Sequence, residues 1–231
     1  MNLPEPAYDV VPSSKIRRVT AKRLRASNSD KPQVTLHRTI GAGPLVDRLS
    51  ALRAAGTGSA SPTITSLFAV ALVRALRRDP VMNSTLEADD ELRHYDEVHL
   101  AVAIATDQGL ITPVLRPSDL IDDVTASAAL AQLGQQARAG SIKPDQLAPF
   151  TFTLTNLGAY GVEYFTPIVN PPNVGILGLG RSPIEGGRHL PLSLTFDHAA
   201  VDGIDGAEFL QRVAEEVEAI TSVRIPENYE A

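Results

Sequence analysis

Cysteine is missing from this chain of 231 residues. Its absence excludes a disulfide framework, a thiolate nucleophile and a cysteine-ligated metal site. An excess of positive charge is missing too, because 21 lysines and arginines stand against 27 acidic residues, a formal net charge of −6. This balance argues against a general nucleic-acid binder, so any anionic ligand must be met by local groups. There is no membrane-length apolar run and no signal-like N-terminus, which favours a cytoplasmic protein without membrane contact.

Several catalytic motifs are also missing. A nucleophile elbow of the Gly-x-Ser-x-Gly kind does not occur, which argues against a serine hydrolase. The glycine-rich stretches 41–43 and 175–180 lack the lysine and hydroxyl of a phosphate-binding loop. Five histidines are present, but none has the clustered partners that a catalytic zinc requires. We therefore expect neither nucleotide hydrolysis nor a metal site.

Length and composition favour one large domain over two small ones, since 43% of the residues are hydrophobic and can bury a substantial core. Pro4, Pro6 and Pro12 prevent regular structure in residues 1–12, which we interpret as a linker to a domain at 13–231. Apolar residues at helical spacing predict five helices. They cover 13–27 with a serine cap, 44–55, 62–78, 124–138 and the stretch that follows Asp205 and Glu208, which have capping-box spacing.

Alternating patterns predict strands over 34–40, 98–105, 110–115, 150–155, 174–179 and 190–196. The strand at 98–105 is apolar on both faces and should lie inside a sheet, whereas Pro113 places the next strand at an edge or bulge. The last two strands form a plausible hairpin. Thr151, Thr153 and Thr155 share one face, so their strand has one polar side. The pattern predicts a mixed α/β fold without internal repeats.

His198 is the strongest chemical candidate. It follows an apolar strand and precedes Asp202 and Gly203 in a His-x-x-x-Asp-Gly turn. An acyl transferase needs a base that titrates near neutrality, and histidine is the side chain that does so without perturbation. Asp202 can hold the local geometry, and glycine permits the turn. These positions alone leave a purely structural histidine open.

Five segments, taken together, resemble one family. They are residues 16–24, 100–114, 151–158, 165–178 and 197–203. In order and content they are similar to the catalytic (E2 core) domain of the dihydrolipoamide acyltransferases of 2-oxoacid dehydrogenase complexes. The resemblance covers nearly the whole chain from about residue 15. It implies a single-domain α/β fold like that of chloramphenicol acetyltransferase, a mixed sheet flanked by helices.

The resemblance also implies a reaction, in which an acyl group of acetyl or branched-chain type moves between dihydrolipoamide and coenzyme A. His198 would be the general base that deprotonates the attacking thiol, and Thr155 would donate to the oxyanion of the tetrahedral intermediate. Asp202 would stabilise the histidine loop by pairing with Arg17 or Arg18.

The family further suggests Arg53, Thr63 and Asn156 as coenzyme A contacts, although Thr63 beside Pro62 also suits a helix start. Coenzyme A is a substrate here. The lipoyl group would be carried on a separate domain or a missing segment. The implied partners are that lipoyl domain and the E1 and E3 enzymes.

The sequence departs from the family pattern at several positions. Ala199 stands where many relatives have arginine, and Ala105 where some branched-chain enzymes have aspartate. The connection between Gly180 and His189 is shortened, and residues 226–231 are polar where cage-forming cores often end in an apolar anchor. No lipoyl-bearing Asp-Lys-Ala turn occurs.

The His-x-x-x-Asp-Gly motif also occurs in enzymes that carry two related halves, each forming a wall of the other's site. A chain with one half must borrow its second wall, so we expect a homotrimer with sites between protomers, with a larger cage as an open extension. Two other functions stay open. One is an acetyl-CoA-dependent O-acetyltransferase of a small molecule, and the other is a catalytically weak E2-like scaffold.

Overall fold

A mixed six-stranded sheet organises the molecule. The structure is a computed structural model that describes residues 7–56, 60–87, 91–182 and 187–222. Its strands lie in the order β1, β10, β9, β8, β4, β7. Neighbouring pairs are antiparallel except β9 with β8 and β8 with β4, which are parallel. The bounds are β1 Gln33–Gly41, β4 Leu100–Val102, β7 Val114–Leu115, β8 Phe152–Asn156, β9 Gly175–Leu179 and β10 His189–Asp197.

Two short hairpins stand outside this sheet. They are β2 (Ser84–Leu86) with β3 (Leu92–His94), which the sequence pattern did not predict, and β5 (Ile104–Thr106) with β6 (Gly109–Ile111). The predicted strand at 98–105 is therefore two strands. The strand divides because its backbone hydrogen bonds change partner. The N–H of Ala103 still donates to the carbonyl of Leu154 in the sheet, but Ile104 pairs with Ile111 in the hairpin. The predicted strand at 110–115 divides in the same way at Pro113, and β7 is an edge strand as expected.

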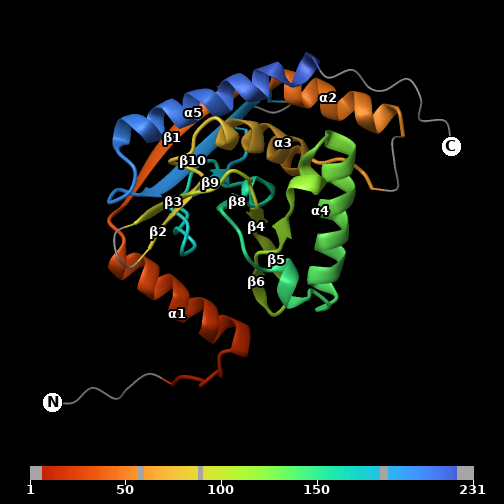
Figure 1. Cartoon of the computed structure of the whole chain (residues 1–231). Helices are drawn as coiled ribbons and strands as arrows, with labels where there is room; N and C mark the ends of the chain where they lie inside the picture. Colours follow the sequence, from red (N-terminus) through yellow and green to blue (C-terminus); the bar gives the residue numbers. More distant parts are fainter. Residues whose placement is uncertain (1–6, 57–59, 88–90, 183–186, 223–231) are drawn as a thin grey trace.

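The described residues form five α-helices. They are α1 Lys15–Asp30, α2 Gly43–Ala54, α3 Ile64–Arg77, α4 Asp123–Arg138 and α5 Gly203–Glu218. In Figure 1, α5, α3 and α2 lie together along one side of the sheet, α4 stands beside them, and α1 extends away from the body. The Ser14 hydroxyl accepts from the N–H of Arg17 and caps α1, as predicted. None of the helices that the structure describes is long and apolar enough to cross a membrane.

The start of α5 corrects a prediction. The expected capping pair was Asp205 and Glu208, but the helix begins at Gly203 with Asp202 as its N-cap and Asp205 in the third position. Asp205 thus accepts from the N–H of Asp202 at 3.3 Å. Asp202 has the extended backbone of an N-cap residue, so the helix starts three residues earlier than predicted. The histidine loop therefore ends at Asp202, just before Gly203, and does not extend to Asp205.

The two faces of the sheet differ in chemistry. Leu36, Leu194, Leu177 and Leu154 are neighbours across four strands. The last three belong to the main hydrophobic core with residues of α3 and α5, and the partly buried Leu36 packs against it. Each buried leucine stabilises the fold by about 2 kcal/mol of transfer free energy. The opposite face carries the predicted threonines, of which Thr151 and Thr153 are buried, so this face is closed to water along most of β8.

Candidate active site

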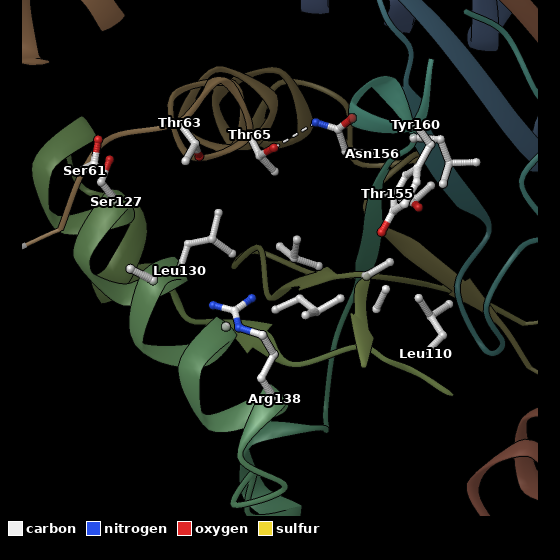
Figure 2. Close-up of a pocket in the computed structure, with 17 residues that line it drawn as sticks. Ser61, Thr63, Thr65, Leu110, Ser127, Leu130, Arg138, Thr155, Asn156 and Tyr160 are labelled. Carbon is white, nitrogen blue, oxygen red and sulfur yellow. Dashed lines mark hydrogen bonds between the residues drawn. The ribbon is translucent and has the colours of Figure 1, made fainter. Parts of the chain in front are cut away.

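A pocket of about 470 Å³ opens at the carboxyl end of β8, between α4, the start of α3 and the β5–β6 hairpin (Figure 2). Its surface is mostly apolar and hydroxyl-bearing, with one amide and one arginine side chain. The lining residues are Ser61, Thr63, Thr65, Val102, Ala103, Ile104, Ala105, Leu110, Ser127, Leu130, Ala131, Gly134, Arg138, Thr155, Asn156, Leu157 and Tyr160. Three of the predicted site residues, Thr155, Asn156 and Thr63, are thereby brought together in one cavity.

Thr155 is the residue of β8 whose hydroxyl is available for chemistry. Its side chain lies on the polar face and lines the pocket, half-buried. No hydrogen bond joins that hydroxyl to another residue in the described part of the chain. A hydroxyl on a strand, close to the pocket and without a protein acceptor, can donate to an oxygen atom of a bound ligand.

Asn156 and Thr63 both carry structural bonds as well as lining the pocket. The Asn156 side chain donates to the Thr65 hydroxyl at 2.9 Å and accepts from the N–H of Gly158 at 2.8 Å, so it ties the end of β8 to α3. Thr63 is the N-cap of α3, where its hydroxyl accepts from the N–H of Ser66 at 3.1 Å. The helix-start interpretation of Thr63 is therefore correct, and it does not exclude contact with a ligand.

Arg53 lies beside the pocket without lining it. Its guanidinium donates twice to the carbonyl of Pro62, at 3.2 and 3.0 Å, from the last turn of α2. These bonds hold the residue before Thr63 in place. Arg53 thus supports the pocket wall and leaves donors on its guanidinium that the Pro62 carbonyl does not use.

His198 occupies a turn directly after β10. Its side chain is 42% exposed, and Nδ1 lies 3.9 Å from Oδ1 of Asp202, which is 83% exposed. The distance is too long for a hydrogen bond but places the two groups on the same surface. Asp202 pairs with neither Arg17 nor Arg18 within the described chain; the Arg18 guanidinium instead donates to the carbonyl of Ser13.

A buried ion pair that the sequence analysis missed holds the histidine turn. Asp197, 1% exposed, accepts from Nζ of Lys31 at 2.6 Å, and its other oxygen accepts from the N–H of Ala199 at 3.1 Å. The N–H of His198 donates to the carbonyl of Pro32 at 2.9 Å. The turn is thus fastened to the segment between α1 and β1. The acidic residue next to His198 was the only local signal, and its partner is 166 residues away.

Within one chain, His198 and Thr155 lie at opposite ends of the sheet. Register aligns Thr155 with Gly178 on β9, and Gly178 with Ser193 on β10. From Ser193 to Asp197, the strand advances by four residues, about 13 Å at about 3.3 Å per residue, before His198 is reached. His198 is not among the residues that line the pocket. Within one chain, the two side chains therefore lie too far apart to contact the same small group.

The described residues place no three histidine, aspartate or glutamate side chains together in a way that could hold a metal ion. The site residues described above offer an imidazole beside a carboxylate at one end of the sheet, and a hydroxyl in a largely uncharged pocket at the other. An imidazole moves protons, and a hydroxyl donates to a developing negative charge. These are the two functions that acyl transfer between thiols requires.

Comparison with known proteins agrees with this chemistry. The family model for the 2-oxoacid dehydrogenases acyltransferase (catalytic domain) matches residues 5–225. A relative in Bacillus subtilis, the dihydrolipoyllysine-residue acetyltransferase component of an acetoin cleaving system, is 37% identical over 87% of this chain and 53% of its own length. The corresponding pyruvate dehydrogenase component of Mycobacterium tuberculosis is 32% identical over 89% of this chain and 40% of its own. The chain thus spans about half, or less, of the length of these curated relatives.

Solved structures give the same result. The dihydrolipoamide acetyltransferase of Azotobacter vinelandii has a TM-score of 0.86 at 28% identity, covering 95% of this chain and 99% of that one. Chloramphenicol acetyltransferase, at 15% identity and a TM-score of 0.53, covers 87% of this chain and 94% of its own and shares the fold. The predicted single-domain α/β architecture is confirmed. The chain belongs to the 2-oxoacid dehydrogenase acyltransferase family and matches its catalytic domain.

Proposed function

We propose that this chain is the acyltransferase domain of an E2 component, which moves an acyl group between dihydrolipoamide and coenzyme A. The catalytic domain would comprise residues 13–231, and a linker at 1–12 would precede it. Residues 1–6 of the linker and residues 223–231 of the domain lie outside the part that the structure describes. The observation that carries the proposal is a free hydroxyl, Thr155, in the pocket of a family member that also keeps the His198 turn.

The four-residue separation of His198 and Asp202 supports their assignment as catalytic residues. In the Azotobacter vinelandii enzyme, a serine, a histidine and an asparagine were investigated for roles in the catalytic mechanism, and the asparagine follows the histidine by four positions. Here Asp202 follows His198 by four positions, and Thr155 offers a hydroxyl as serine does. The substitution of aspartate for asparagine puts a carboxylate near Nδ1, where it can favour the imidazolium that forms during proton transfer.

The chemistry of one transfer then follows from these three residues. His198 accepts the proton of the attacking thiol as the sulfur bonds to the thioester carbonyl carbon. Thr155 donates to the carbonyl oxygen, which becomes negative in the tetrahedral intermediate. A donor of this kind stabilises the transition state by about 3 to 4 kcal/mol. When the intermediate collapses, the second sulfur leaves and His198 returns the proton to it. No oxidant or reductant is consumed.

Two copies of the chain would build each site. Since His198 and Thr155 lie at opposite ends of one sheet, the histidine end of one protomer would face the pocket end of its neighbour. A head-to-tail contact of this kind closes into a ring, and a homotrimer is the arrangement that we propose. A related solved structure is described as the cubic core of a pyruvate dehydrogenase multienzyme complex, so further assembly into a cage is part of the proposal.

Coenzyme A fits the pocket region by its chemistry. Thr63 and Asn156 offer polar atoms along the wall, and Arg53 has guanidinium donors beside it that could meet a phosphate. The lipoyl group would reach the site on another domain or chain, with E1 loading it and E3 reoxidising it. A cytoplasmic location completes the proposal and can be tested by localising a tagged protein in the source cell.

The test is a transfer assay with purified protein. With acetyl-CoA as donor, free dihydrolipoamide should be acylated, and small hydroxylated acceptors should not. His198→Ala should lower kcat at least a thousandfold, and Thr155→Val about a hundredfold, while Thr155→Ser keeps most of the rate. His189→Ala is the matched control, since that histidine begins β10 and is not part of the proposed chemistry. Transfer only to hydroxyl acceptors would contradict the proposal, as would a fully active His198→Ala.

A further inference from the structure

Among the described residues that line the pocket, Arg138 is the only one with a charged side chain. It is exposed, belongs to the last turn of α4 and makes no ion pair or hydrogen bond with another described residue. Figure 2 shows its guanidinium raised from α4 into the space below Leu130, with Thr63 and Thr65 on the far wall. An unpaired guanidinium offers five donors and a permanent positive charge to whatever fills the cavity.

A glycine in the preceding turn of α4 leaves space for the Arg138 side chain against the helix. Gly134 is buried one turn before Arg138, and a Cβ atom there would meet Nη2 of Arg138 at 3.3 Å and Nη1 at 3.6 Å. The missing side chain therefore makes room for the guanidinium on the pocket face of the helix. A helix that placed Arg138 only to complement its C-terminal dipole would not need a glycine at that position, because glycine costs about 1 kcal/mol relative to alanine inside a helix.

We propose that Arg138 is a specificity-determining residue that binds an anionic group of the ligand in this pocket. The inference rests on the proposed function, which supplies two sources of such a group. One is a phosphate of coenzyme A, and the other is a carboxylate at the far end of the acyl chain. The other described residues of the lining are uncharged, so none of them offers the anion a second full positive charge. With a net charge of −6 on the chain, this local cation also offsets the repulsion that an anionic ligand would meet.

Equilibrium binding to the full chain, measured by calorimetry, separates the two sources. The phosphate arm compares coenzyme A with pantetheine, and the carboxylate arm compares S-succinyl-pantetheine with S-acetyl-pantetheine. In whichever of the two arms contains the true ligand group, Arg138→Gln should reduce the ratio of affinities for the charged and the uncharged ligand by about tenfold to a hundredfold. This is the effect of losing a charge-assisted hydrogen bond. Gly134→Ala, which crowds the guanidinium, should reduce the same preference by a smaller factor.

Arg77→Gln is the matched control, because it removes an arginine from the last turn of α3, away from the pocket, and should leave both ratios unchanged. If Arg138→Gln shifts neither ratio, or if the wild type prefers neither charged ligand, the inference is overturned. Failure of the proposed function has a different signature. In that case the wild type transfers no acyl group to dihydrolipoamide, whereas a protein that transfers normally but shows no Arg138 effect loses only this inference.

Discussion

Gly180 lies where two backbone segments pass too closely for any side chain. A Cβ atom there would come within 1.6 Å of the carbonyl oxygen of Glu163, and Arg181 donates its N–H to Val162 at 2.7 Å across the same crossing. Backbone atoms cannot yield as the end of a long side chain can. The crossing places the segment after β8, which holds the pocket residues Leu157 and Tyr160, against the end of β9.

We expect Gly180→Ala to destabilise the fold by more than about 4 kcal/mol, the range of the most severe single substitutions. Chemical denaturation followed by circular dichroism measures this change. Gly203→Ala is the control, because a Cβ atom there meets nothing within 4 Å. Equal stability of the two variants would show that the 162–164 segment can move aside.

Lys31 is expected to position His198 without touching a substrate. Removing one partner of a buried ion pair leaves the other charge unpaired, which costs about 3 to 5 kcal/mol. Lys31→Met should therefore lower the free energy of unfolding by that order and also lower kcat, because Asp197 holds the turn that carries His198.

A conservative change separates positioning from stability. Lys31→Arg keeps the charge and should recover kcat to within about tenfold of the wild type. Lys22→Met, on the exposed part of α1, should change neither property. A Lys31→Met protein with reduced stability but full kcat at a temperature where it stays folded would argue that the pair is purely structural.

An ion pair between Asp79, which lies just after the C-cap of α3, and Arg212 of α5 links these two helices. Nε of Arg212 lies 3.5 Å from Oδ2 of Asp79, which is too poorly aligned to count as a hydrogen bond. Burial raises the pKa of Asp79 above its usual value of 3.8, and it outweighs the lowering by the Met82 N–H and by Arg212. The folded protein therefore holds this proton more tightly than the unfolded chain does.

This raised pKa gives a pH dependence with a definite sign. The contribution of Asp79 to stability is fully present below the unfolded pKa near 3.8 and is lost as pH rises through the higher folded pKa. Asp79→Asn removes the titrating carboxyl group, so the variant does not lose this stability as pH rises. The stability of the variant relative to wild type should rise with pH above about 4 and then become constant. Urea denaturation at a series of pH values measures it, with the exposed Asp96→Asn as the control. A relative stability that falls across this range would contradict the assignment.

Element boundaries show what local pattern can predict. The helices and the strands around Thr155 and His198 were predictable, because spacing of 3.6 or 2 residues is a property of the segment itself. The division of the 98–105 strand was not, because it depends on where Ala103 and Ile104 find hydrogen-bond partners in distant segments. The capping of α5 by Asp202 was missed for a related reason, since the turn that precedes it is set by Asp197 and Lys31.

The whole molecule determines how the site is completed. The spacing of His198 and Asp202, and the hydroxyl of Thr155, could be recognised along the chain. Their positions at opposite ends of one sheet follow from the register of β8, β9 and β10, which the sequence pattern does not specify. The strand register provides a geometric reason for the proposed sharing of the site between copies, which stays a prediction.

Mixing two inactive variants tests the shared site. His198→Ala and Thr155→Val should each be inactive alone. When they are unfolded together and refolded at equal amounts, about a quarter of the sites should combine an intact histidine from one copy with an intact threonine from its neighbour. Activity should therefore return to about a quarter of the wild-type level. Refolding each variant alone is the control, and a mixture that stays inactive despite native mass would place both residues in one chain.

Pairing of β1 with β10 has a consequence for how the protein is made. Thr35 and Thr195, partners in this ladder, are 160 residues apart in sequence. During synthesis at about 5 to 20 residues per second, β1 emerges from the ribosome roughly 10 to 30 seconds before its partner exists. Its alternating threonine, histidine and arginine side chains keep the waiting segment from being continuously apolar. The unpaired β1 segment is therefore less prone to aggregate in the time before β10 is synthesised and pairs with it.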